Sequence, residues 1–196
     1  MFLFQGFDSK FLLTAISKLS GVDKSKIQIT AVNSQKVTSI RLHCYLFKDS
    51  AKFVNSSLQK LAEIHFQSYA DFAMLRNHPV CKNIDGSFSP EKFNLLATGK
   101  QYFPYDFVTS KESLLHIGLP TREDFFNKLT GSTLSQEEYE HANIVYKTFE
   151  CTNLQDYMLL YLCTDVLLLA SIFDSFCNMA YNKLNIWPSH FLSTPG

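Results

Sequence analysis

The stretch TNLQDYMLLYLCTDVLLLASIFDSFCNMAYNK (Thr152–Lys183) decides the fold expected for this chain of 196 residues. It contains no Gly or Pro, and the first helix breaker that follows it is Pro188. Thr152 and Asn153 each precede a capping partner by three residues, which is the spacing of a capping box. We therefore expect one helix over about residues 152–183, roughly 45 Å long and longer than most helices of globular proteins.

This helix is apolar around its whole circumference between Tyr157 and Phe173, so we expect it to be buried on most of its faces. Asp165 is the one charged residue in that run. Tyr161 precedes it by four positions, which places the phenol and the carboxylate on the same helical face. An ionised carboxylate in such apolar surroundings needs a cation or strong hydrogen-bond donors beside it.

Three interpretations of Asp165 are open at this point. A membrane span is disfavoured, because the apolar run has 17 residues (157–173) where about 20 are needed, and a central Asp costs about 2.5–3.5 kcal/mol on insertion. The second interpretation is a buried structural carboxylate, hydrogen-bonded to the backbone or to a hydroxyl such as that of Thr164. The third is a functional carboxylate that binds a divalent cation, beside a phenol that orients a water molecule.

The composition disfavours several classes of protein. With 46% hydrophobic and 18% charged residues, the chain has enough apolar material for one globular domain. A formal net charge of zero gives no overall basic field, which disfavours a free-standing DNA-binding protein. The 5 cysteines and 6 histidines lack metal-binding spacing, so we expect reduced intracellular thiols and no zinc site. The first residues lack a basic region, so we expect no signal peptide.

The rest of the sequence predicts a mixed α/β (α+β) domain around a small sheet. The expected elements are, in chain order, a strand end at 2–5, a helix from Asp8, a β-hairpin formed by 27–32 and 37–47, a short helix over 56–65, an irregular segment over 66–108 and a helix over 135–149. The helices at 56 and 135 each begin with a Ser that is followed three residues later by Gln or Glu, as in a capping box.

Carboxylates occupy two further positions of interest. Asp8 follows a Gly turn at an expected strand–helix junction, where it is either an N-cap or a site residue. Asp49 ends an expected strand, and we interpret it as the first residue of an Asx-turn. Two carboxylates from distant parts of the sequence, Asp8 and Asp165, fit part of a two-metal phosphodiester hydrolase, since Mg²⁺ takes oxygen ligands. Such a site normally uses three or four carboxylates.

Several stretches resemble family B DNA polymerases. QGFDSKFLL (Gln5–Leu13) resembles the second exonuclease motif, and YLCTD (Tyr161–Asp165) resembles the third. FKDSAKFVNSSLQKLA (Phe47–Ala62) resembles the Asp-Ser segment of the protein-primed members, which include phage, linear-plasmid and Polinton/Maverick-type transposon polymerases. Residues 100–120, 135–176 and 190–196 are also similar to the transposon-type enzymes, so the resemblance covers nearly the whole chain.

The resemblance implies an RNase-H-like 3′–5′ exonuclease domain that precedes a polymerase palm. Asp8 and Asp165 match the carboxylates that bind Mg²⁺ or Mn²⁺, and Tyr161 matches the tyrosine that orients the attacking water. Phe7 and Ser50 fall where the family contacts the 3′ end of single-stranded DNA. The full-length enzyme would also use dNTPs and a terminal priming protein, and the resemblance implies no membrane.

The sequence also departs from the family pattern. The first exonuclease motif, Asp-x-Glu, is absent, and the Asn of the second motif is replaced by Leu3 or Phe4. Ala51 follows Ser50 where the family prefers Leu. We therefore expect residues 1–196 to be a single partial exonuclease domain with an N-terminally truncated sheet, flanking helices and little or no catalysis. The competing hypothesis is a non-enzymatic module, derived from a transposon polymerase, that binds single-stranded DNA or a protein.

Overall fold

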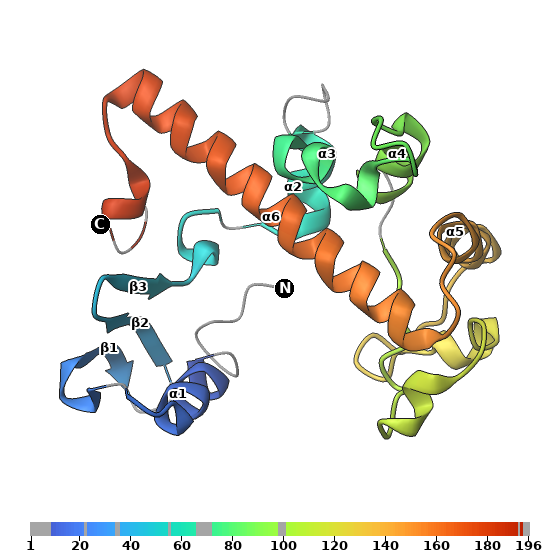
Figure 1. Cartoon of the computed structure of the whole chain (residues 1–196), viewed down its shortest axis with the longest axis horizontal. Helices are drawn as coiled ribbons and strands as arrows, with labels where there is room; N and C mark the ends of the chain where they lie inside the picture. The colour runs from blue at the N-terminus through green and yellow to red at the C-terminus, as the bar shows by residue number, and fades with distance from the viewer. Residues whose placement is uncertain are drawn as a thin grey trace. The chain divides into compact units, whose positions relative to one another are not determined.

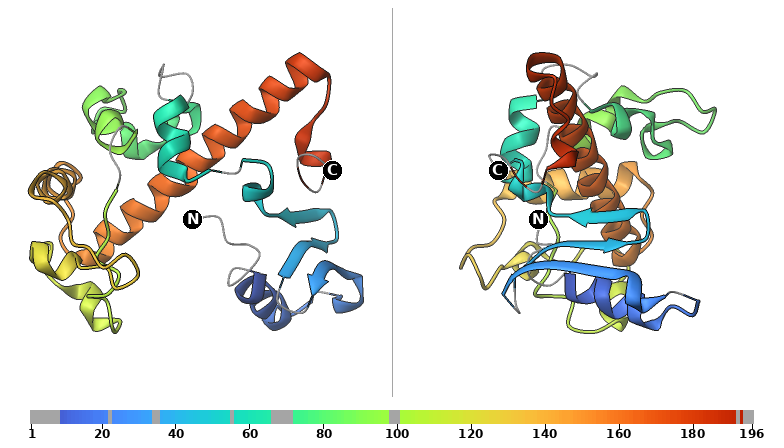
Figure 2. Two further views of the ribbon diagram at one scale, coloured as in Figure 1. Left: turned by 180° about the vertical axis from the view of Figure 1, so that it is seen from behind. Right: turned by 90° about the vertical axis from the view of Figure 1, so that its left-hand side faces the viewer.

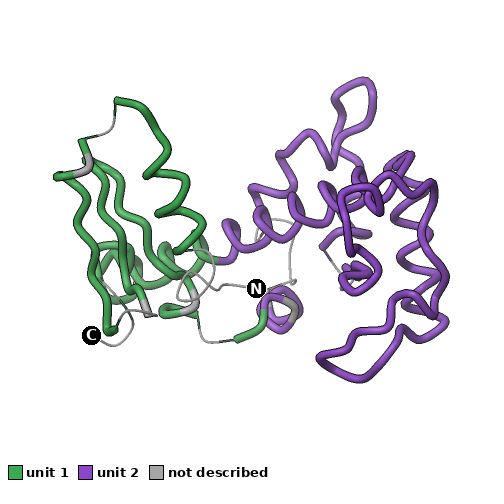
Figure 3. Tube along the Cα trace, turned by 90° about the horizontal axis from the view of Figure 1, so that it is seen from below, with its two compact units in different colours: residues 1–57, 173–196 green, residues 58–172 purple. Residues whose placement is uncertain are grey.

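The computed structural model describes residues 9–21, 23–33, 36–54, 56–65, 72–97, 101–191 and 193 (Figure 1). They form two compact units, of which the first contains residues 1–57 and 173–196 and the second residues 58–172 (Figure 3). The main elements are α1 (Ser9–Lys18), β1 (Ile27–Asn33), β2 (Lys36–Leu42), β3 (Tyr45–Lys48), α2 (Leu58–His65), α3 (Ala73–Asn77), α4 (Pro90–Ala97), α5 (Gln136–Thr148) and α6 (Leu154–Leu184). The predicted mixed α/β class with a small sheet is confirmed.

The sheet belongs to the first unit. Among the described residues, three strands pair antiparallel in the order β1-β2-β3. The prediction of one strand over 37–47 is wrong, because β2 and β3 are separate strands joined at a tight turn that pairs Leu42 with Tyr45. His43 in this turn has a φ of 51°, a left-handed conformation that a continuous strand excludes.

One face of this sheet is covered by α1 (Figure 2). Ile16 of α1 packs with Val37 and Ile40 of β2, and all three are buried. Lys48 at the end of β3 donates hydrogen bonds to the carbonyl oxygens of Ser189 and Phe191, at 2.6 and 2.8 Å. Burial lowers the pKa of its ammonium group. These contacts connect the sheet to the segment that follows α6.

The core of the second unit is formed by α2 to α5 and the first part of α6. Its fully buried side chains include Phe72, Leu75, Phe93, Leu96, Val145, Leu154 and Tyr157. The prediction of an irregular segment over 66–108 is wrong in part, because α3 and α4 lie within it. Pro90 is the first residue of α4, a position where the missing N–H costs nothing. The Met74 N–H of α3 donates to Ser171 Oγ of α6 at 3.2 Å.

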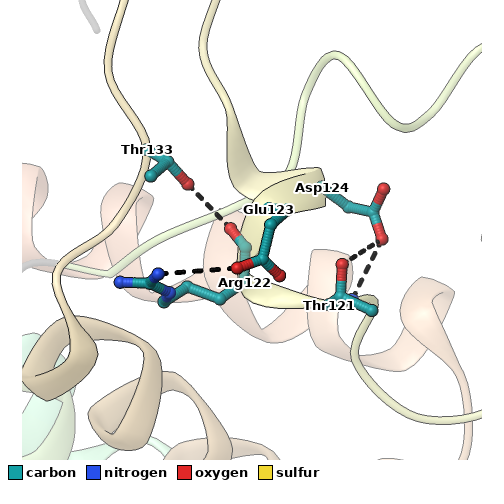
Figure 4. A network of polar contacts seen from close by, with 5 residues as sticks. All are labelled: Thr121, Arg122, Glu123, Asp124 and Thr133. Atoms are coloured by element: carbon teal, nitrogen blue, oxygen red, sulfur yellow. Dashed lines mark hydrogen bonds and ion pairs between the residues drawn. The ribbon is translucent and has the colours of Figure 1, made fainter.

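A loop before α5 is fastened by local polar contacts (Figure 4). Thr121 and Asp124 form a capping box at the 3-10 helix η7 (Arg122–Phe125). The Thr133 hydroxyl donates to the Arg122 carbonyl oxygen at 2.7 Å, which joins the two ends of the loop. The Arg122–Glu123 ion pair in the same loop spans 3.5 Å and is exposed, so it contributes little to stability.

The long helix forms as predicted but is less buried than predicted. Asn153 Oδ1 accepts the Asp156 N–H at 3.0 Å, and the Asp156 carboxylate accepts the Thr152 N–H at 2.9 Å, so the helix begins with side-chain capping. The expectation that this helix is buried on most faces is wrong. The second unit covers only the side of the helix that carries Leu160, Thr164 and Leu168. The opposite side is apolar and exposed, with Leu159 at 53%, Leu162 at 48% and Val166 at 63% of their accessible surface.

Among the described residues, α6 is the one helix long and apolar enough to cross a membrane. Its best window has a mean hydropathy of 1.7, and 22% of that window is buried. Length and composition alone are weak support for a span, because the core helix of a soluble protein passes the same test.

The N-terminus of α5 provides a test of helix capping. Ser135 Oγ accepts the Glu138 N–H at 3.1 Å, and Glu138 Oε2 accepts the Ser135 N–H at 2.8 Å, which confirms the predicted capping box. We expect Ser135→Ala to lower the free energy of unfolding by about 1 kcal/mol, because one N–H loses its partner. Ser135→Asp, which keeps an acceptor, is the control and should unfold like the wild type in urea. An equal decrease in the free energy of unfolding in both variants would contradict the role of this cap.

Candidate functional site

Tyr161 and Asp165 lie one turn apart on α6, and their side chains meet as the sequence spacing predicted. The two side chains are close enough for each to shift the pKa of the other. Burial raises the pKa of Asp165, and the nearby Tyr161 hydroxyl lowers it by a smaller amount. Burial, followed by the contacts with Tyr105 and Asp165, raises the pKa of the Tyr161 phenol. The phenol is therefore protonated at neutral pH.

Two aromatic rings from outside α6 hold the Tyr161 phenol. The Phe103 ring centroid lies 5.9 Å from that of Tyr161, with the two rings tilted by 36°. Tyr105 contacts Tyr161 edge to face, with centroids 6.1 Å apart and an interplanar angle of 86°. Both are favourable geometries for aromatic pairs. Tyr161 is thus enclosed by its own helix and by the segment that contains Phe103 and Tyr105.

The same segment is anchored at a second point on α6. Phe103 stacks on Tyr157, with centroids 6.4 Å apart and rings inclined by 17°. The Tyr157 hydroxyl is buried and donates to the Tyr102 carbonyl oxygen at 2.8 Å. Because a buried hydroxyl without a partner costs about 1–3 kcal/mol, this bond fixes how the segment lies along the helix.

A third anchor joins the segment to α5. The Tyr102 hydroxyl donates to Glu138 Oε1 at 2.7 Å, and burial together with this hydrogen bond raises the pKa of Tyr102. Glu138 also caps α5, so one carboxylate serves both contacts. The sequence analysis names neither Phe103 nor Tyr105, because it predicts only an irregular segment over 66–108. The dense aromatic run from 102 to 105 is the signal that could have indicated them.

The structural interpretation of Asp165 through Thr164 is wrong. The Thr164 hydroxyl is fully buried and donates to the Leu160 carbonyl oxygen of its own helix at 2.9 Å. Its one proton is therefore already used, and Tyr161 carries the hydroxyl that is close enough to lower the pKa of Asp165. Asp165 itself is partly buried.

The other predicted site residues lie elsewhere in the chain. Phe7 and Asp8 fall outside the described residues. Ser50 is described, and it begins the 3-10 helix η3 (Ser50–Lys52) in the first unit, where its carbonyl oxygen accepts the Phe53 N–H at 2.9 Å. Its neighbour Asp49 is buried, with 3% of its surface exposed. The convergence of Asp8 with the Tyr161–Asp165 pair stays a prediction, and so do the DNA contacts of Phe7 and Ser50.

The described part of the chain does not form a metal centre. Within it, no group of three or more His, Cys, Asp or Glu side chains could hold a metal ion. Asp165 is a suitable oxygen ligand, but Mg²⁺ is bound by several oxygens and the described surroundings of Asp165 supply aromatic rings and one phenol. The described residues alone therefore do not fit a divalent cation, and no chemistry is assigned to one here.

A cleft of about 630 Å³ lies elsewhere in the second unit. It is lined by the end of α5 and by the turn that precedes α4, and it does not include Tyr161 or Asp165. The Lys92 ammonium group lies 5.9 Å from the centroid of the Phe149 ring and donates to the Lys82 carbonyl oxygen at 3.1 Å. The cation is thus held by the protein itself.

Comparison with known proteins identifies the family. The sequence model described as DNA polymerase type B, organellar and viral, matches residues 2–191. The chain belongs to this family. No curated protein and no solved structure matches it. The chain therefore contains a domain of the type B DNA polymerases, an enzyme class that replicates DNA and binds it as substrate. The predicted family B membership is confirmed.

The charge of Asp165 in this type B polymerase gives a pH-dependent prediction. Burial raises the pKa of the folded Asp165 above its unfolded value, so the folded state binds the proton more tightly. The resulting stability is fully present below the unfolded pKa and is lost as pH rises through the folded pKa. We expect Asp165→Asn, which is always neutral, to be more stable than the wild type at pH 7, with a smaller difference near pH 4.

Urea unfolding at a series of pH values measures this difference. Asp174→Asn, at an exposed position on the same helix, is the control and should show a smaller dependence. An Asp165→Asn variant that is less stable than the wild type at every pH would show that the charged carboxylate is stabilised by its surroundings, contrary to this account.

Proposed function

We propose that this chain is the exonuclease-related part of a protein-primed type B DNA polymerase, with an RNase-H-like fold, and that it binds the 3′ end of single-stranded DNA. The observation that carries the proposal is the Tyr161–Asp165 pair. A protonated phenol beside a carboxylate, both fixed by packing, is able to orient a water molecule next to a phosphodiester. The order of the three motifs along the chain agrees with this assignment.

In this proposal the DNA contacts are those that the family resemblance implies. Phe7 stacks on a base, the Ser50 hydroxyl binds a phosphate or sugar, and Tyr161 lies near the terminal phosphodiester. With a net charge of zero, the chain attracts DNA only through local contacts. We therefore expect modest affinity that decreases as salt is added.

We further propose that the chain by itself has little or no nuclease activity. A two-metal site for Mg²⁺ or Mn²⁺ clamps the attacking and leaving oxygens and normally needs three or four carboxylates. Asp8 and Asp165 would supply two. With only half of the ligands, the second metal ion is not held in place. The rate of phosphodiester hydrolysis should therefore fall by orders of magnitude. Binding of dNTPs and of a terminal priming protein belongs, in this proposal, to the full-length polymerase.

One observation favours a second candidate, a protein-binding module. The apolar side of α6 with Leu159, Leu162 and Val166 is exposed in this chain. Apolar side chains at this helical spacing are typical of a face that packs against another protein surface. This module would bind a partner without metal and without catalysis.

The proposal is tested with purified chain and a single-stranded oligonucleotide labelled at its 5′ end. We expect binding by fluorescence anisotropy, and we expect no more degradation with Mg²⁺ or Mn²⁺ than the Asp165→Ala variant shows. Phe7→Ala should weaken binding by roughly 5- to 100-fold, since base stacking contributes about 1–3 kcal/mol. Phe11→Ala, which removes an exposed ring from α1, is the matched control.

Two outcomes would contradict the proposal. Metal-dependent degradation that Asp165→Ala abolishes would show a complete exonuclease. Absence of binding, or equal binding by the Phe7→Ala and Phe11→Ala variants, would remove the DNA site and favour the protein-binding module.

A further inference from the structure

Lys48 ties the end of β3 to the segment that follows α6. It is the last residue of β3, and its backbone pairs with that of Ser39 in β2. Its Nζ donates to the carbonyl oxygens of Ser189 at 2.6 Å and of Phe191 at 2.8 Å. These acceptors lie 141 and 143 residues further along the chain, so a single ammonium group joins two distant parts of the first unit.

The segment 187–191 presents these carbonyl oxygens because it is folded into a tight turn. One turn of 3-10 helix lies at its centre, and the Phe191 N–H donates to the Pro188 carbonyl oxygen at 2.9 Å. Trp187, at its start, packs edge to face on Tyr181 of α6, with ring centroids 5.7 Å apart and an interplanar angle of 71°. The segment is therefore ordered by its own contacts, and the ammonium group fastens it to the sheet.

Ser50 lies two residues after Lys48, in a turn that has a second anchor on its far side. The Ser50 carbonyl oxygen accepts the Phe53 N–H at 2.9 Å and the Val54 N–H at 3.1 Å. Phe53 is buried and contacts Phe173 of α6 edge to face, with ring centroids 5.6 Å apart and an interplanar angle of 69°. The Ser50 turn is therefore held by Lys48 before it and by Phe53 after it.

We propose that Lys48 is a positioning residue, which holds the Ser50 turn in place by binding the two carbonyl oxygens of the segment 187–191. The inference rests on the proposed function for its meaning, because a hydroxyl that binds a phosphate or sugar must be presented by a fixed backbone. Lys48 acts through this turn and not by contact with DNA, since the two carbonyl oxygens take two of its three N–H donors. Hydrogen bonds from a charged donor are stronger than those from a neutral one, which suits an anchor.

The test compares amide hydrogen exchange, followed by NMR, in the wild type and in Lys48→Met. This substitution nearly keeps the length of the side chain and removes the ammonium group. The amides of Phe53 and Val54 report on the turn, because both donate to the Ser50 carbonyl oxygen. We expect both amides to exchange at least tenfold faster in the variant, because the turn opens more often.

The segment 187–191 has a reporter of its own. Trp187 is the single tryptophan of the chain, so the tryptophan fluorescence comes from this residue alone. We expect acrylamide to quench that fluorescence at least twofold more efficiently in Lys48→Met, because the segment leaves the end of β3. Unchanged quenching would show that other contacts hold the segment, and it would overturn the anchoring by Lys48.

Two variants and one distant amide are the controls. Lys48→Arg keeps a cation with several N–H donors and should restore both measurements to nearly the wild-type values. Lys18→Met removes an exposed ammonium group from the end of α1 and should change neither measurement. The Tyr139 amide of the second unit, which donates to the Ser135 carbonyl oxygen, should exchange at the wild-type rate in every variant.

Three results of the exchange measurement would overturn the positioning role. The first is exchange at Phe53 and Val54 that stays as slow in Lys48→Met as in the wild type. The second is equal acceleration at Tyr139, which would show a general loss of stability. The third is exchange as fast in Lys48→Arg as in Lys48→Met. Neither measurement uses DNA or metal, so their failure is distinguishable from a failure of the proposed DNA binding.

Discussion

The packing of residues 102–105 against the first part of α6 is the constraint on which the candidate site depends. Tyr157 anchors this segment through one buried hydrogen bond to the Tyr102 carbonyl oxygen, and Phe103 stacks on its ring. Once this register is fixed, Phe103 and Tyr105 are placed around Tyr161 and, through it, beside Asp165. Tyr102 extends the same arrangement to the Glu138 cap of α5. Capping, helix packing and site geometry are thus coupled within the second unit.

Local signals in the sequence predicted the parts of this structure that depend on short-range interactions. The helix caps at Ser135 and around Asp156 could be predicted from the sequence, because the side-chain and backbone partners lie within one helical turn of each other. The position of Tyr161 and Asp165 on the same face of α6 could be predicted for the same reason. The turn at His43 was missed because its flanking residues favour strands on both sides. Pro90 lies in the segment over 66–108 that is predicted to be irregular, although it begins α4.

Long-range features could not be predicted from periodicity. The aromatic segment around Phe103 contacts a helix that begins about 50 residues later, and no local pattern specifies that pairing. The burial of α6 was overestimated for a physical reason. Apolar residues all around a helix show that every face can be buried, but the neighbouring elements determine which faces are buried in the fold. The roles of Phe7, Asp8 and Ser50 come from the family resemblance and remain predictions.

Membership in the organellar and viral type B DNA polymerases gives the site a context that its geometry alone does not. A partly buried carboxylate with one phenol beside it is a weak catalyst in isolation, because burial disfavours its charged form. In the proposed function, further carboxylates and a divalent cation would complete the pair. The proposal therefore combines a well-packed Tyr161–Asp165 pair with the expectation of little catalysis.

An experimental structure of the chain with a short single-stranded oligonucleotide and Mn²⁺ tests this account most directly. The account predicts that the 3′-terminal phosphodiester lies within about 3–4 Å of the Tyr161 hydroxyl or the Asp165 carboxylate, with Tyr105 still in contact with Tyr161. An oligonucleotide bound elsewhere, or a Tyr161 phenol turned away from Asp165, would contradict it.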